Sequence, residues 1–273
     1  MTVASVVVAT HPAYGVLRPV TELASVLLAD NPGPMTLDGT NTWLLGRPGE
    51  RATVVVDPGP DDEDHVRRVA GLSRPALIVI THGHRDHTGG ARLLHELTGA
   101  PVRAADPAQC IGGPPLRPAE VIASGDTELR VLATPGHTMD SVCLVLPDTG
   151  GVLTGDTVLG RGTTVIMHPE GSLGAYLSSL RGLAELPAGT PVLPGHGPDL
   201  RDLAGTARRY LAHREERLDQ IRRALATLGD DATPRQVVEL VYQDVDRALW
   251  WAAEVSVGAQ LAYLRGATPE RLG

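Results

Sequence analysis

The stretch THGHRDHTGG, residues 81–90, places three histidines and an aspartate within six positions. The apolar run PALIVI directly before it predicts a buried strand, and the residues after it predict the start of a helix. The cluster is therefore expected in a strand-to-helix loop, where a rigid scaffold commonly presents its binding and catalytic residues. We expect a metal or catalytic site here rather than part of the core.

The residue types and their spacing favour metal binding. His82 and His84 are two positions apart on an extended loop, so both imidazoles can converge on one ion, while Asp86 and His87 follow where the chain turns and can face a second ion. Four such side chains in six positions are a stronger signal than a lone His-x-His. Imidazole and carboxylate without thiolate suit zinc or another divalent transition ion.

A site for two ions needs further ligands, and three candidates stand in turns that each follow an apolar run. They are His137 in ATPGHTMDS, Asp156 in VLTGDT and His196 in VLPGHG. Each alone can be an ordinary turn residue. Their shared setting, a strand end and then glycine, predicts that they lie along one edge of the sheets, and a carboxylate such as Asp156 can bridge two ions.

Several other residues are candidates for supporting or contacting this site. Asp57 in VVVDPG is expected to accept the N–H of a ligand histidine, although a turn-forming role before proline explains it equally well. Asn41 in DGTNTW is expected on the floor of the site as a substrate contact, with a plain strand start as the alternative. The glycine-rich segment 160–171 is expected to face the substrate, where Arg161 or His168 can meet an anionic group.

The composition describes an ordinary globular chain. It has 273 residues, 42% of them hydrophobic, and a mean hydropathy near zero. The early apolar run VASVVVA (3–9) is too short for a membrane span and lacks a basic leader, so it predicts a first strand and a cytoplasmic protein without a membrane partner. Cys110 and Cys143 lie far apart, which argues against a disulfide framework.

The pattern of apolar residues divides the chain at about residue 205. Residues 1–205 alternate β-branched runs with glycine and proline turns, which is typical of a mixed α/β domain. Residues 206–273 carry three amphipathic stripes, the second capped near Thr233, and predict a small all-helical domain.

Charge is also divided unevenly between these two parts. The second part has 10 arginines and 10 acidic residues, so residues 1–205 carry the whole formal charge of −8. This balance argues against high-affinity binding of duplex nucleic acid, but leaves room for a local basic groove.

Through THGHRDH, PGHT, TGDT and PGHG, the first 200 or so residues resemble the metallo-β-lactamase superfamily. The resemblance implies an αββα sandwich with two zinc ions at one edge. Carried over position by position, it implies that one ion is held by His82, His84 and His137, the second by Asp86, His87 and His196, and that Asp156 bridges them.

Within the superfamily, NPGPMTLDGTNTWLL (31–45) and the C-terminal helices resemble the lactamase-beta-like hydrolases. This group includes single-stranded-RNA endonucleases and is relatively close to thioesterases that act on carrier-bound polyketides, and its likeness implies a winged-helix-like C-terminal domain. True zinc β-lactamases carry cysteine where Asp156 stands, and flavodiiron relatives carry glutamate where His84 stands, so both activities are disfavoured.

The function expected from these features is that of a binuclear zinc hydrolase. A hydroxide held between the two ions attacks a carbonyl or phosphorus, and Asp86 is expected to move the proton. The acidic charge favours a small thioester or ester substrate. A single-stranded endoribonuclease is the alternative within enzymes, and a metal-dependent binding module without catalysis is the alternative outside them. The oligomeric state stays open.

Overall fold

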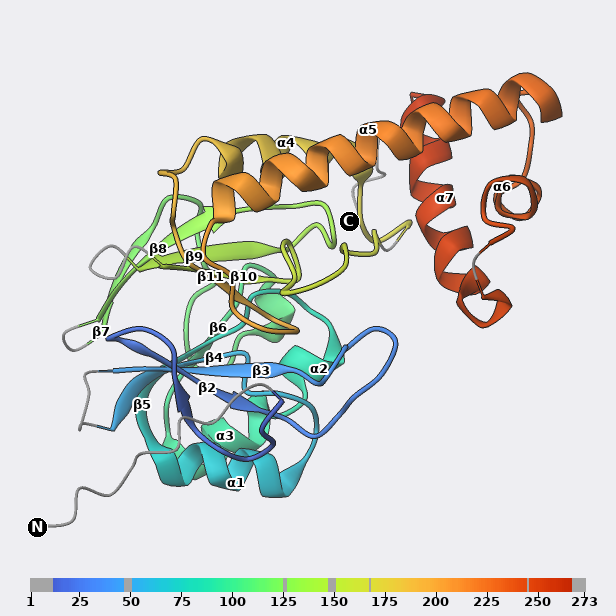
Figure 1. Cartoon of the computed structure of the whole chain (residues 1–273). Coiled ribbons are helices and arrows are strands. Elements are labelled where there is room, and N and C mark those ends of the chain that lie inside the picture. Colours follow the sequence, from blue (N-terminus) through green and yellow to red (C-terminus); the bar gives the residue numbers. More distant parts are fainter. Residues whose placement is uncertain are drawn as a thin grey trace, which may run out of the picture.

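The computed structural model describes residues 12–46, 51–124, 127–146, 151–166, 168–244 and 246–266. Two sheets face each other, with helices on both outer faces, so the expected αββα arrangement is confirmed (Figure 1). The run 3–9, expected to form a first strand, lies outside the described residues. No helix in the described part of the chain is both long and apolar enough to span a membrane.

The first sheet has six strands and is antiparallel from β1 to β4 and parallel from β4 to β6. In spatial order its strands are β1 (Arg18–Pro19), β2 (Ala24–Leu28), β3 (Asn41–Leu45), β4 (Ala52–Val56), β5 (Ser73–Val79) and β6 (Val102–Arg103). Its outer face is covered by α1 (Glu63–Leu72) and α3 (Ala91–Thr98), with the one-turn helix α2 (Arg85–Thr88) at the edge.

The second sheet has five strands, with β10 and β11 parallel and the other pairs antiparallel. In spatial order they are β11 (Val192–Pro194), β10 (Gly151–Gly155), β9 (Val142–Leu146), β8 (Thr127–Ala133) and β7 (Val121–Ser124). Helices α4 (Leu173–Ala184) and α5 (Leu203–Leu228) cover its outer face (Figure 1), and a short 3₁₀ turn, η1 (Pro107–Gln109), follows β6.

The central strands are buried on both faces, which explains why they read as continuous apolar runs in the sequence. In β4, Val54 and Val56 point into the core between the two sheets, whereas Val55 points into the core under α1 and α3. In β5, Val79 likewise points into the core between the sheets, and Ile78 points into the core under α1 and α3. This tight burial fixes the register of both strands, and therefore the place where each strand ends.

The strand ends bring the loops of the candidate site to one edge. β4 and β5 run parallel, so the residues after both strands emerge on the same side, and β10 and β11 do the same in the second sheet. An isolated β-bridge between Thr40 and His196 connects the two sheets at this edge. A site built here can take side chains from both halves of the sandwich.

Three helices follow the sandwich, as expected: α5, α6 (Pro234–Val241) and α7 (Trp250–Leu264), with η2 (Arg247–Leu249) before the last. Thr233 forms the predicted N-cap in a full capping box. No strand occurs in the described residues after 194, so the helices are shown, whereas a winged-helix likeness is not confirmed.

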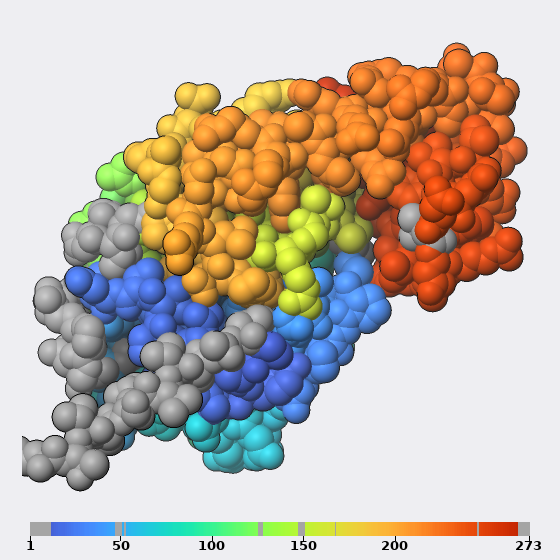
Figure 2. All heavy atoms as spheres, in the orientation of Figure 1, coloured from blue at the N-terminus to red at the C-terminus, as the bar shows by residue number. Residues whose placement is uncertain are grey.

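Helix α5 belongs to two cores. Near its start, Leu203 and Tyr210 pack with α4 in the core outside the second sheet, whereas Ile221 and Ala224 pack with α6 and α7 in a separate core. We call α6, α7 and the C-terminal half of α5 the helical appendage. Figure 2 shows α5 running along the surface from the sandwich into this appendage. The predicted division at residue 205 thus falls in the first turn of a helix that both parts share.

Candidate metal centre

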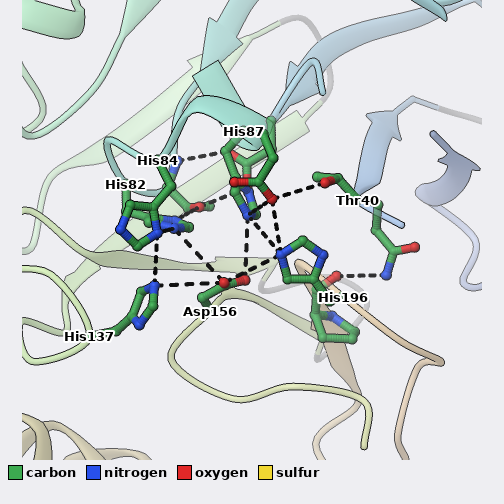
Figure 3. A network of polar contacts seen from close by, with 12 residues as sticks. Thr40, His82, His84, His87, His137, Asp156 and His196 are labelled. Carbon is green, nitrogen blue, oxygen red and sulfur yellow. Dashed lines mark hydrogen bonds and ion pairs between the residues drawn. The ribbon is translucent and has the colours of Figure 1, made fainter. Parts of the chain in front are cut away.

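Seven histidine and aspartate side chains converge at the edge where the strands end (Figure 3). They form two groups, and the ligand-type atoms within each group lie within 4.8 Å of one another. One group contains His82, His84, His137 and Asp156, and the other contains Asp86, His87 and His196. The structure therefore brings together all seven residues singled out in the sequence, and both groups can hold a metal ion.

Within each group the ring nitrogens face one another at close range. His84 Nδ1 lies 3.0 Å from Nε2 of His82 and 3.1 Å from Nε2 of His137. In the other group, Nε2 of His196 lies 3.2 Å from Nε2 of His87.

The carboxylate of Asp156 lies between the two groups. Its Oδ2 is 3.7 Å from Nε2 of His137 and 3.4 Å from Nε2 of His196, and its Oδ1 is 3.5 Å from Nε2 of His87. Oδ1 is buried and has no hydrogen-bond partner. A buried carboxylate oxygen without a donor is costly unless a cation satisfies it, and through its two oxygens this carboxylate reaches both groups.

The outward nitrogens of three rings are held by acceptors behind the site. His87 Nδ1 contacts Asp57 at 2.8 Å, His137 Nδ1 contacts the carbonyl of Val165 at 2.6 Å, and His196 Nδ1 contacts the carbonyl of Gly39 at 3.0 Å. A carbonyl or carboxylate can only accept, so each Nδ1 carries a proton, and each ring in its neutral form turns the lone pair of Nε2 inward.

This arrangement fits a divalent cation in each group. The Nε2 atoms of His87 and His196 lie 3.2 Å apart. If both carry inward lone pairs, these repel each other unless a proton or a metal ion lies between them. The donor set of five imidazoles and two carboxylates, with no thiolate, suits zinc and neighbouring transition ions.

The carboxylates make the second group strongly attractive to positive charge. Burial opposes a charge on His196, but the Asp156 carboxylate outweighs it and raises the pKa of His196 to about 9. Burial likewise opposes a charge on His87, but Asp57 and Asp86 hold its pKa well above the usual value. The negative field of this group therefore favours a cation at the position between these rings.

The first group has less negative charge around its rings. Burial lowers the pKa of His137 to about 4 and that of His82 well below its usual value. These two rings are therefore neutral at pH 7 and ready to act as ligands without losing a proton.

Asp57 is fixed by three hydrogen bonds. It accepts from the backbone N–H of Thr81 at 2.8 Å, from the Thr81 hydroxyl at 2.7 Å and from His87. Its backbone lies in the left-handed region, with φ of 52°. Both expectations for Asp57 thus describe its position, since it forms a turn and also contacts the ring of His87.

The turn that carries His196 is held from the first sheet. Asn41 is buried and donates its side-chain amide to the carbonyls of Pro194 and Gly197, at 3.0 and 2.8 Å. These two hydrogen bonds support the turn, and a substrate contact by Asn41 stays a prediction. Its neighbour Thr40 donates its hydroxyl to Asp86 Oδ2 at 3.0 Å (Figure 3).

Two glycines allow these turns to approach each other. Gly155, directly before Asp156, has φ of 47°, which favours glycine. At Gly195, a Cβ atom would lie 2.5 Å from Asp156 Oδ1 and 2.7 Å from His87 Cε1. Gly195, the glycine in VLPGHG, therefore belongs to the site, whereas its sequence pattern indicates only a turn.

The two remaining candidates lie around the site on segment 160–171. Arg161 forms an ion pair with Asp38, with 2.8 Å between its second guanidinium nitrogen and Oδ1, and so ties this segment to the loop before β3. His168 is exposed and its ring lies against α7, because a Cβ atom at Gly258 would be 3.5 Å from His168 Cδ2. A substrate contact by either side chain stays a prediction.

Other proteins share this sequence pattern and fold. Residues 35–196 match the metallo-beta-lactamase superfamily. The chain is 32% identical over 259 residues to the beta-lactamase-like protein 2 homolog of Caenorhabditis elegans, which covers 89% of this chain and 85% of that protein. It is also 32% identical over 241 residues to the atrochrysone carboxyl ACP thioesterase of Aspergillus fumigatus, with 79% and 72% covered.

A crystal structure of a beta-lactamase domain protein from Burkholderia ambifaria superimposes with a TM-score of 0.77 at 22% identity, covering 94% of this chain and 90% of that one. This likeness shows a shared fold. The matched sequence segment spans more than half of the chain and contains all seven clustered side chains. This protein therefore belongs to the metallo-beta-lactamase superfamily.

Proposed function

We propose that this protein is a binuclear zinc-dependent hydrolase. The observation that carries the proposal is the position of Asp156, whose carboxylate reaches both groups of ligand-type side chains. One ion would be held by His82, His84 and His137, the other by Asp86, His87 and His196, and Asp156 would serve both. Other divalent transition ions fit the same donors.

The bound pair of ions would supply a hydroxide nucleophile near neutral pH and a Lewis acid for the reacting carbonyl or phosphoryl oxygen. The protein's own part is to fix geometry and to move a proton. Asp57 and the carbonyls of Val165 and Gly39 hold three ligand rings in one tautomer. Asp86 is half-buried, its Oδ2 is held by Thr40, and it is the group proposed to accept a proton and pass it to the leaving group.

The proposed substrate is a small thioester or ester. The formal charge of −8 lies on residues 1–205, which disfavours a polyanionic substrate and has little effect on a small acyl group. The similarity to a protein named as an ACP thioesterase points in the same direction.

A single-stranded endoribonuclease is the second candidate, and one feature of the helical appendage favours it. A groove of about 530 Å³ lies between α5 and the end of α6, lined by Arg217, Arg223 and Tyr242 among others. The guanidinium of Arg217 lies 5.0 Å from the centroid of the Tyr242 ring. Cationic and aromatic side chains together are typical of surfaces that bind single strands.

The test presents zinc-loaded protein with acyl thioesters, simple esters, lactones and single-stranded RNA in parallel, at physiological salt. We expect turnover of the acyl substrates, and its loss in His82→Ala. Cleavage of RNA alone, lost in the same variant, would replace the first candidate by the second. Two bound zinc ions without turnover of any substrate would favour a metal-dependent binding module.

A further inference from the structure

Arg214 on α5 is a buried cation without a counter-charge. The residue is only 4% exposed, and no carboxylate forms an ion pair with it in the described parts of the chain. Its guanidinium donates to the backbone carbonyl of Thr164 and lies 5.4 Å from the centroid of the Tyr176 ring on α4. Its Nε has no hydrogen-bond partner. Burying a charge in this way opposes folding, so an apolar residue at this position would be expected if packing alone mattered.

The carbonyl that Arg214 holds belongs to a segment that touches the metal centre twice. The hydroxyl of Thr164 donates to the backbone carbonyl of Asp156 at 2.7 Å. The next residue, Val165, offers its carbonyl to Nδ1 of His137 at 2.6 Å. The residue that Arg214 holds, Thr164, therefore precedes Val165, whose carbonyl orients the proposed ligand ring of His137. The side chain of Thr164 also contacts the proposed bridging residue, Asp156.

The aromatic partner of Arg214 holds the same region from the other side. Tyr176 is fully buried. Its hydroxyl donates at 2.7 Å to the carbonyl of Thr157, the residue directly after Asp156. Arg214 thus lies between two contacts that fix the chain from 156 to 165. A planar guanidinium can donate to a carbonyl and face an aromatic ring at the same time, which an ammonium group does less well.

We propose that Arg214 is a positioning residue for the metal centre. It holds Thr164 and Val165 so that His137 keeps its orientation and Asp156 keeps its reach to both groups. This inference rests on the proposed function, because it assigns a task only if His137 and Asp156 bind metal. Arg214 lies on α5 between Tyr210 of the core outside the second sheet and Ile221 of the appendage core.

The test is the zinc affinity of metal-free protein, measured by titration against a competing chelator, with the unfolding temperature of each metal-free variant measured in parallel. In Arg214→Met we expect the weaker of the two zinc sites to lose about 10-fold or more in affinity, as is usual when a partner behind a ligand is removed. Arg214→Lys keeps a donor for the Thr164 carbonyl and is expected to recover part of this loss.

Leu218→Ala is the matched control, because Leu218 lies one turn further along α5 in the same core as Tyr176 and carries no polar contact. It is expected to lower the unfolding temperature while leaving zinc affinity within about 2-fold, because it creates a core cavity without removing a polar contact to segment 156–165. Equal loss of affinity in Leu218→Ala and Arg214→Met would overturn the inference, since a general loss of stability would then explain both.

Two outcomes separate this inference from the proposed function. If the unaltered protein binds no zinc, the proposed function fails, and the inference fails with it. If the unaltered protein binds two zinc ions and Arg214→Met binds them equally well, only the inference fails. Should Arg214→Met not fold, Arg214→Lys decides, because it keeps the positive charge and a donor but loses the planar guanidinium: zinc binding a few-fold or more weaker than in the unaltered protein supports the inference, and unchanged binding overturns it.

Discussion

The carboxylate of Asp57 shows how a residue outside the ligand set determines the chemistry of one that is inside it. It is 1% exposed and sits in a left-handed backbone conformation, both of which are costly for an aspartate. Its contact with Nδ1 of His87 fixes the tautomer of that ring. The hydrogen bonds from Thr81 then hold the carboxylate itself, so the strained turn after β4 and the ligand after β5 act as one unit.

Replacing Asp57 is therefore expected to weaken the site without removing a ligand. Asp57→Ala should lower zinc affinity or activity by about 10 to 100-fold, because His87 loses the acceptor that orients it. The measurement is chelator-competition titration together with turnover of the preferred substrate. Asp62→Asn is a suitable control, since Asp62 only caps α1 and asparagine caps a helix equally well. Undiminished zinc binding in Asp57→Ala would show that His87 is oriented by other groups.

A second residue-scale prediction concerns stability and pH. Burial lowers the pKa of His65 from 6.5 to about 4, and its Nε2 lies 2.9 Å from the hydroxyl of Thr42. The folded protein keeps this ring neutral, while the unfolded chain takes up a proton as the pH falls below 6.5. Stability from this residue is thus complete above pH 6.5 and is lost as the pH falls towards 4, by about 3 kcal/mol in all.

Urea unfolding at pH 7.5 and pH 5, compared between the unaltered protein and His65→Gln, isolates this contribution from that of the other histidines. The variant should lose less stability than the unaltered protein over the same pH interval. Parallel losses in the two proteins would contradict the assignment.

At the scale of elements, the sequence predicts the site better than its support. Strand ends followed by glycine and a ligand-type residue are visible as patterns, because a buried strand is an apolar run and a tight turn needs glycine. The partners of His137 and His196 are backbone carbonyls, which any residue type can supply, so no sequence pattern marks Val165 or Gly39. The sequence likewise does not reveal that the Asn41 amide supports the turn of His196, because a small polar residue at a strand start can support a turn or contact a substrate equally well.

The division of the chain was harder to predict for a related reason. The change in composition near residue 205 is real, but α5 begins at Leu203 and continues for 26 residues through both cores. A helix can change the partner of its apolar face along its length without any change in its periodicity. The pattern therefore predicts the helix well and its two partners poorly.

The close approach of two turns gives a prediction at this scale. In Gly195→Ala the new methyl group would collide with Asp156 Oδ1 and His87 Cε1, so one turn must move away from the other. We expect both zinc content and turnover to fall together, by at least about 10-fold, since Asp156 is the residue proposed to serve both ions. Elemental analysis and kinetics provide the measurement.

Gly182→Ala is the matched control for that variant. Gly182 lies within α4, and a Cβ atom there would meet nothing within 4 Å. Alanine in a helix is about 0.5–1 kcal/mol more favourable than glycine, so the control should be as stable as the unaltered protein or slightly more so. Full zinc content in Gly195→Ala would mean that the turns adjust without disturbing the bridging carboxylate.

At the scale of the whole molecule, charge and shape favour different substrates. Residues 1–205, which form the sandwich with the candidate metal centre at its edge, carry the acidic excess. Residues 206–273 carry equal numbers of arginines and acidic residues, and they contain the groove with Arg217, Arg223 and Tyr242. Helix α7 offers no arginine between its first residue and Leu264. A strand of RNA would therefore have to rely on the groove for binding, while a small acyl substrate needs neither the groove nor a long-range field.

Salt dependence separates these two possibilities. Each phosphate contact made by an arginine releases counterions, so binding of single-stranded RNA should weaken steeply between 50 and 200 mM salt, whereas hydrolysis of an uncharged thioester should change little.

Turnover of both substrates is measured across the salt series with unaltered protein and with Arg217→Gln/Arg223→Gln. Because these side chains lie in the groove and outside the candidate metal centre, the variant should hydrolyse a thioester as well as the unaltered protein does. Any RNA binding should show a salt slope shallower by about one to two units. One result would contradict both the acyl substrate and the role of the groove. It is efficient RNA cleavage that tolerates high salt, is unchanged in the double variant and is lost in His82→Ala. RNA recognition would then lie on the sandwich itself.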